Sequence, residues 1–169
     1  MTVDQATGDI LSELHAIDLI KWGWRDTLHL FDARYWRRFE ETELSRDTMV
    51  GIFHRDPFHF NKVEVLSDEK ASLYPQFEAG DMLLSLRELN LVVIVRPSEE
   101  RIVWWRYGLT SAQHDSSFLE GHVEVYDNNP RSVPPRPRIA RLDLDTQRAD
   151  TLFDLSRWKI EMRAHGNFE

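Results

Sequence analysis

From Met49 onward the chain has the pattern of short strands and turns, and its run over 60–65 alternates hydrophobic and polar residues with a period of two. This period is typical of β-strands with one face in a core and the other in solvent. Short clusters of Gly, Asn, Asp and Pro interrupt the pattern about every 10 residues. Such spacing predicts short antiparallel strands in a meander, sandwich or propeller. The predicted strands cover residues 50–53, 60–65, 81–86, 91–95, 101–107, 113–119, 122–126, 138–144 and 148–154.

The first 48 residues follow a different pattern. Ile10, Leu11, Leu14, Ile17 and Ile20 fit either a strand or one face of a helix. We predict a strand up to about Leu14, a short helix over 16–22 and a second helix around 26–36, so that a helical insertion occupies about 16–48. Its aromatic residues either form a stacking wall for an aromatic ligand or cap a sheet as buried tryptophans. They are Trp22, Trp24, Tyr35 and Trp36.

Two strands that each begin near a histidine suggest an internal repeat. His59 and His114 are 55 residues apart, which is close to the length of one four-stranded propeller blade with a long loop. The repeat predicts blade-like units at about 49–107 and 108–160. Equivalent starts of successive blades face the same axis, so we expect both histidines to line one channel.

His59, His114 and Arg87 together suit the transfer of an anionic group. A neutral imidazole can attack such a group and carry it covalently, while fixed cations offset the charge on its oxygens. Arg87 ends an apolar strand, which favours an inward position, and its planar fork can donate two parallel hydrogen bonds to an oxyanion. The alternative is a local ion pair with Glu88.

A metal site is a further alternative, because His59, His114, Asp56 and Asp115 are all possible ligands. No H-x-H or H-E-x-x-H spacing supports it, and Arg87 in the same site would disfavour a cation. We therefore expect neither a metal nor another cofactor.

Composition narrows the function classes. The 169 residues are 41% hydrophobic and 30% charged, and the longest apolar run, 89–95 interrupted only by Asn90, is too short to cross a bilayer. A net charge of −8 without a basic block argues against nucleic acid as a partner. The absence of cysteine excludes disulfides and thiolate chemistry. The first residues lack a secretory signal, so the native compartment stays open: the chain as written would remain in the cytosol, whereas a longer exported or periplasmic parent would show the same pattern.

Five stretches match the motifs of a known family. They are His59-Phe60-Asn61, the strand from Gly80 to Arg87, Gln113-His114-Asp115, Tyr126-Asp127-Asn128 and the strand from Arg138 to Asp143. In these stretches the chain resembles the aryl sulfate sulfotransferases, a family of six-bladed β-propellers. The resemblance covers about Thr7 to Thr146, which corresponds to roughly three blades. It implies an all-β fold of antiparallel four-stranded blades in a partial propeller, with a short N-terminal helical insertion.

The resemblance also implies a reaction and a set of roles. Family members transfer sulfuryl groups from an aryl sulfate to a phenol without a nucleotide donor. By this resemblance His114 corresponds to the sulfated nucleophile, while His59 and Arg87 bind and polarise the sulfate. Asn61 and Asn128 match further motif positions and are candidates for substrate binding or for orienting strands and turns.

The chain departs from the family pattern in two respects. A further histidine from an earlier blade has no matching context here, and three blades cannot close a ring. We therefore expect a fragment of a longer protein, or copies that associate through exposed blade edges. The alternative function is a catalytically inactive propeller that serves as a binding or scaffold module.

Overall fold

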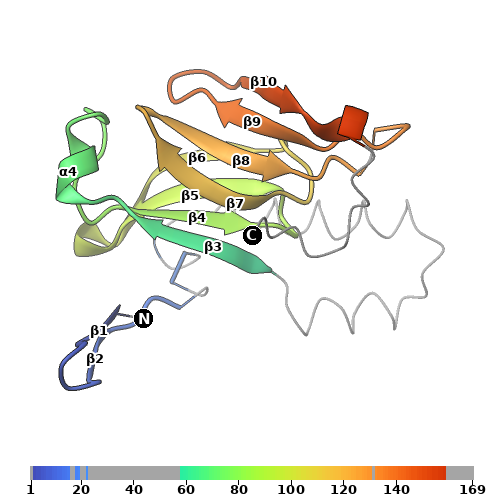
Figure 1. The fold of residues 1–169 in the computed structure, drawn as a ribbon. Coiled ribbons are helices and arrows are strands. Elements are labelled where there is room, and N and C mark those ends of the chain that lie inside the picture. Colours follow the sequence, from blue (N-terminus) through green and yellow to red (C-terminus); the bar gives the residue numbers. More distant parts are fainter. Residues whose placement is uncertain (1, 16–17, 20–21, 23–57, 131, 159–169) are drawn as a thin grey trace, which may run out of the picture.

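The described part of the chain is mostly β structure. The computed structural model describes residues 2–15, 18–19, 22, 58–130 and 132–158. Within these residues two four-stranded antiparallel sheets lie side by side, and the helices are short (Figure 1). None of the helices in the described residues is long and apolar enough to cross a membrane.

The first sheet is a simple meander in the order β3-β4-β5-β6. Its strands are β3 (Phe60–Val65), β4 (Met82–Leu86), β5 (Leu91–Arg96) and β6 (Arg101–Tyr107). The short helix α4 (Asp68–Ala71) follows β3, and its N-terminus is capped by the Ser67 side chain, which accepts a hydrogen bond from the Lys70 backbone. A 3-10 turn, η1 (Pro97–Glu99), joins β5 to β6.

The second sheet repeats this meander in the order β7-β8-β9-β10. Its strands are β7 (His114–Leu119), β8 (His122–Asp127), β9 (Arg138–Leu142) and β10 (Ala149–Asp154), followed by the 3-10 turn η2 (Leu155–Trp158). Glu120 and Gly121 form the two-residue connection between β7 and β8, both with positive φ. This is the backbone that a type I′ hairpin turn requires. A separate hairpin near the N-terminus pairs β1 (Thr2–Val3) with β2 (Ile10–Ser12).

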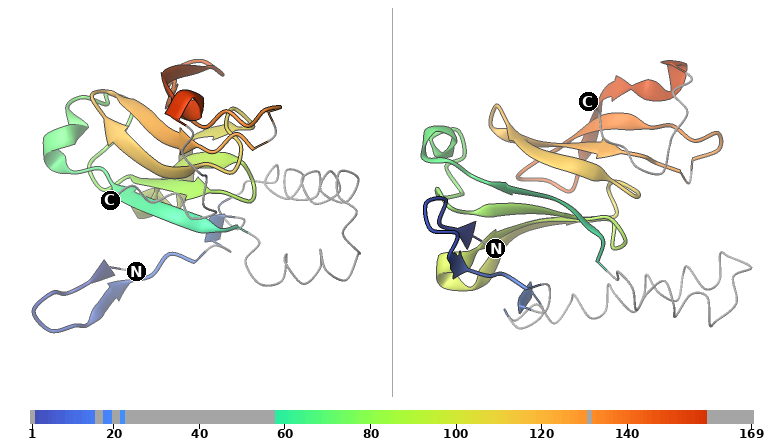
Figure 2. Two further views of the ribbon diagram at one scale, coloured as in Figure 1. Left: turned by 45° about the vertical axis from the view of Figure 1, so that its right-hand side comes forward. Right: turned by 60° about the horizontal axis from the view of Figure 1, so that its bottom comes forward.

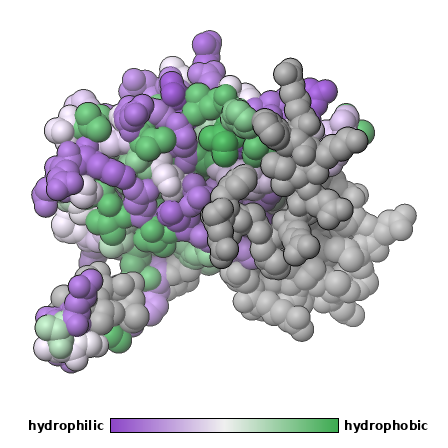
Figure 3. Space-filling view, in the orientation of Figure 1, coloured by the Kyte–Doolittle hydropathy of each residue, from purple (hydrophilic) through white to green (hydrophobic). Residues whose placement is uncertain are grey.

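The two sheets contact each other through β7, which lies against β3 and β4. The views in Figures 1 and 2 agree on this arrangement. β3 and β10 are outer strands of the described sheets, and both expose apolar side chains. On the face that Figure 3 shows, hydrophobic patches lie among hydrophilic ones. The exposed residues are Phe60, Val63 and Val65 on β3 and Leu152 and Phe153 on β10.

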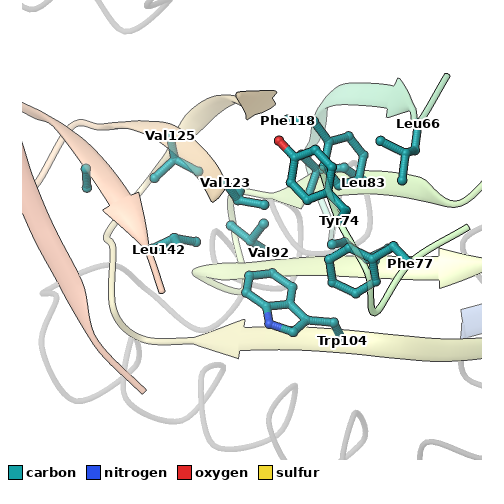
Figure 4. Packing of buried hydrophobic residues seen from close by; sticks show 12 residues of the cluster. Leu66, Tyr74, Phe77, Leu83, Val92, Trp104, Phe118, Val123, Val125 and Leu142 are labelled. Carbon is teal, nitrogen blue, oxygen red and sulfur yellow. The ribbon is translucent and has the colours of Figure 1, made fainter. Parts of the chain in front are cut away.

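The main core lies between the two sheets and under the loop that carries α4 (Figure 4). Phe118 on β7 is fully buried there, and its ring centroid lies 5.1 Å from that of Tyr74 in an edge-to-face contact. Both sheets and the loop contribute buried side chains, so the sheets share one core. Its members are Leu66, Tyr74, Phe77, Leu83, Val92, Ile94, Trp104, Phe118, Val123, Val125, Ala140 and Leu142.

The opposite face of the first sheet packs against the N-terminal segment. Buried Leu19 and partly buried Leu14 and Trp22 cover it. Because both faces of the sheet are covered, every residue of β5 is buried, although successive side chains point to opposite faces. For Trp22, this confirms the interpretation that the aromatic residues cap a sheet.

The predicted strands from 60 onward are confirmed to within one or two residues at each end. In the N-terminal segment the strand β2 ends at Ser12, two residues before the predicted end. Residues 18–19 are helical, as predicted. The rest of the helical insertion, the strand over 50–53 and the start of the first blade-like unit lie outside the described residues.

Candidate functional site

The predicted site residues meet at one end of the two sheets. His59 immediately precedes β3 and Arg87 immediately follows β4, while His114 begins β7 and Asn128 follows β8. Neighbouring strands in each sheet run antiparallel, so the start of one lies beside the end of the next. The contact of β7 with β3 and β4 then joins the two strand ends into one cluster.

The two histidine rings are close to each other. Their centroids are 6.3 Å apart, and the ring planes are inclined by 77°. His59 has a left-handed backbone, with φ of +48°, and His114 is buried, with 6% of its surface exposed. The two histidines therefore lie together although they are separated by 55 positions in the sequence, and the channel that they were expected to line stays a prediction.

The backbone of Arg87 is hydrogen-bonded to His59, one member of this pair. Its N–H donates to the His59 carbonyl at 3.1 Å. The guanidinium Nη1 forms an ion pair with Glu88 Oε1, so the predicted local alternative is present. This is not an open surface pair, because the Arg87 and Glu88 side chains are only 24% and 12% exposed. Among the described residues Arg87 Nε is buried and has no hydrogen-bond partner.

Asn61 lies on β3 and holds the chain just before His114. Its Nδ2 donates to the Gln113 carbonyl at 2.8 Å. The fully buried Gln113 side chain in turn donates to the carbonyls of Leu86 and Leu91, each at 3.1 Å. These bonds tie the start of β7 to the end of β4 and the start of β5, an arrangement that suits the strand-orienting role, one of the two predicted for Asn61.

Asn128 is directed at the backbone beside His114. Its Nδ2 donates to the Ala112 carbonyl at 2.6 Å and lies 2.9 Å from His114 Nδ1. The same carbonyl is 3.1 Å from His114 Nδ1. Ala112 has a φ of +52°, and its N–H donates to Asn90 Oδ1 at 2.9 Å. Ala112 could not be recognised from the sequence, because it takes part through its backbone atoms.

Two further groups define the electrostatics near His114. Lys62 Nζ on β3 forms an ion pair of 2.8 Å with Asp115 Oδ1, which follows His114 directly. Tyr126 lies opposite His114 in the β7–β8 ladder. Burial, followed by the charge of Asp127, raises the pKa of Tyr126 above its ordinary value, so the phenol stays protonated at neutral pH.

The described residues include no group of three or more His, Cys, Asp or Glu side chains arranged to hold a metal ion. Asp56, one of the candidate ligands, lies outside the part that the structure describes. What the described cluster does contain is two imidazoles, a guanidinium and amide donors. This donor set suits an anion rather than a cation.

The described part of the chain is thus mainly β-sheet, and two histidines, an arginine and two asparagines gather at one end of its two four-stranded sheets. A family model described as arylsulfotransferase (ASST) matches residues 1–169, and the chain belongs to this family. No curated protein and no solved structure matches it significantly. Membership supports an arylsulfotransferase-like function at the level of the family and implies small-molecule aryl substrates.

Proposed function

We propose that this protein transfers a sulfuryl group from an aryl sulfate to a phenolic acceptor through a sulfohistidine on His114, without a nucleotide donor. The observation that carries the proposal is the meeting of His59 and His114 at the end of both sheets, with Arg87 bound to the His59 backbone. The resemblance, rather than the geometry, selects His114 over His59 as the nucleophile.

The reaction has two steps. In the first, a ring nitrogen of neutral His114 attacks the sulfur, an N–S bond forms, and the S–O bond to the aryl group breaks. The departing phenolate takes a proton from protonated His59. In the second, His59 accepts the proton of the phenol, whose oxygen attacks the same sulfur and breaks the N–S bond. Both histidines return to their starting states, so atoms and protons balance.

Arg87 supports this scheme as the anion-binding group. The Glu88 ion pair occupies Nη1, and the buried Nε lacks a partner among the described residues. A buried donor without a partner costs free energy, typically about 1–3 kcal/mol, and a sulfate oxygen bound at Nε would remove that cost. A guanidinium has five N–H donors, so Arg87 can bind Glu88 and a sulfate at the same time.

The substrate-binding role of Asn61 and Asn128 is part of the proposal only indirectly. Each amide already donates to a backbone carbonyl, that of Gln113 or Ala112. Their contribution to substrate binding is therefore to fix the end of β7 that carries His114.

We also propose that the two sheets are adjacent blades of a propeller. The contact of β7 with β3 and β4 suits neighbouring blades. The strand register also places Tyr126, Ile139 and Phe153 in one row across β8, β9 and β10, on the face turned away from the shared core. Phe153 is 48% exposed, so this row suits a further sheet, supplied by another blade or by a second copy that associates through the exposed edges.

Intact-mass spectrometry tests the proposed function. The protein is mixed briefly with 4-nitrophenyl sulfate, quenched at alkaline pH to preserve a sulfated imidazole, and compared with His114→Ala. We expect a gain of one sulfuryl group that disappears in this variant and at acidic pH, where protonation removes the attacking lone pair. His122→Ala is the matched control, because His122 pairs with Glu124 away from the cluster. No adduct on the wild-type chain would refute the proposal and leave a binding or scaffold module.

A further inference from the structure

The peptide of Ala112 is held from both sides beside His114. Asn90 Oδ1 accepts its N–H at 2.9 Å, and Asn128 Nδ2 donates to its carbonyl at 2.6 Å. Ala112 has a φ of +52°, a left-handed conformation that is unfavourable for a residue with a Cβ. Two asparagines from different turns thus stabilise an unfavourable backbone conformation that directs one carbonyl at His114 Nδ1.

Three atoms meet at this point and leave room for only one hydrogen-bond pattern. Asn128 Nδ2, Ala112 O and His114 Nδ1 form a triangle with sides of 2.6, 3.1 and 2.9 Å. The two N–H bonds of a planar amide diverge too widely to point along two sides of such a triangle. The shortest side is the one from Nδ2 to the carbonyl, so an amide hydrogen lies there. The carbonyl has two lone pairs and can accept a second donor.

The orientation of the Asn128 amide is fixed by the same contact. With the amide reversed, two oxygen atoms would face each other at 2.6 Å, which is repulsive because neither carries a hydrogen. Nδ2 therefore faces the carbonyl. His114 Nδ1 can then make a good hydrogen bond only by donating its own proton to Ala112 O.

We propose that Asn128 and the Ala112 carbonyl are positioning groups that keep His114 in the tautomer with the proton on Nδ1. The lone pair that attacks sulfur is then on Nε2, and the ring is held in orientation by its other nitrogen. This inference rests on the proposed function for its catalytic meaning. The tautomer itself is a property of the resting protein and can be measured without a substrate.

The measurement is a long-range ¹H–¹⁵N correlation spectrum of the protein labelled with ¹⁵N-histidine, at about pH 8, where an ordinary histidine is neutral. His114→Gln assigns the signals. We expect a pyrrole-type shift for Nδ1 and a pyridine-type shift for Nε2 in the wild-type chain. In Asn128→Ala both nitrogens should move toward averaged shifts, and the rate of adduct formation should fall several-fold. The matched control is Asn129→Gly, since Asn129 lies in the same turn with a φ of +40° but donates to Arg136 O.

Asn128→Asp is a nearly isosteric second variant that covers the case in which the alanine variant folds poorly. A carboxylate can only accept, so its oxygen must move away from the Ala112 carbonyl and accept a hydrogen bond from Nδ1–H, and the inference predicts the wild-type tautomer in this variant. A pyridine-type Nδ1 in the wild-type chain, or unchanged shifts in folded Asn128→Ala, would overturn it. A protein with the expected tautomer but no adduct would refute the proposed function alone, so the two failures are distinguishable.

Discussion

Replacing Phe118 by alanine should reveal how strongly the two sheets depend on each other. The Phe118 side chain is fully buried, and its ring contacts those of Tyr74 at 5.1 Å and Phe77 at 6.3 Å between centroids. A buried Phe→Ala change removes about 3–5 kcal/mol from the free energy of unfolding, through lost burial and the cavity left behind. We expect about 4 kcal/mol here, because two aromatic contacts are lost as well.

Urea denaturation followed by tryptophan fluorescence is the appropriate assay. With a slope of about 2 kcal/mol/M, a loss of 4 kcal/mol lowers the midpoint by about 2 M. Phe153→Ala is the matched control, since Phe153 lies on the same sheet but is 48% exposed. Its midpoint should fall by less than about 0.5 M. Similar shifts for the two variants would refute the argument that the sheets share a core at Phe118.

Three further predictions concern charge, protonation and backbone conformation. Glu88→Gln removes the negative charge paired with Arg87. Because such an ion pair contributes about 1 kcal/mol, the aryl sulfate concentration that gives half-saturation of adduct formation should fall roughly fivefold. A higher concentration at half-saturation would contradict this. Burial raises the pKa of Tyr74, so stability is intact below the ordinary value of about 10 and falls as pH rises above it. In urea titrations at several pH values, the free energy of unfolding should decrease less steeply above pH about 10 in Tyr74→Phe than in the wild-type chain. An equally steep decrease in both proteins would contradict this. Gly121 has a φ of +81°, and an added Cβ would lie 3.3 Å from Leu73 O. Gly121→Ala should therefore cost about 1–2 kcal/mol of unfolding free energy, and an unchanged urea midpoint would show that the turn adapts.

The sheets were predictable because their signals are local. Short apolar or alternating runs between turn residues indicated the strands, and Glu120-Gly121 indicated the hairpin turn between β7 and β8. The meeting of His59 and His114 was also predictable, since both stand at the start of equivalent strands in a repeat, and equivalent positions occupy equivalent places in space.

The finer geometry of the site was not predictable. Strand position indicates that Arg87 lies near the site, but it does not decide between a bound anion and Glu88, because both offer oxygen atoms to the same guanidinium. Ala112 has a positive φ, and alanine is not a residue type that indicates such a backbone conformation. That conformation depends on Asn90 and Asn128, which come from other turns, so no local pattern in the sequence contains it.

The contact between the two sheets has a consequence for the order in which the protein folds. Each meander is built from hairpins between neighbouring strands, whose contacts close short loops and form fast. The histidine pair instead joins positions 59 and 114, one from each meander. On the ribosome the first meander can therefore be complete while the pair does not yet exist. The pair forms only when the second meander docks, so its formation reports on a long-range step of folding.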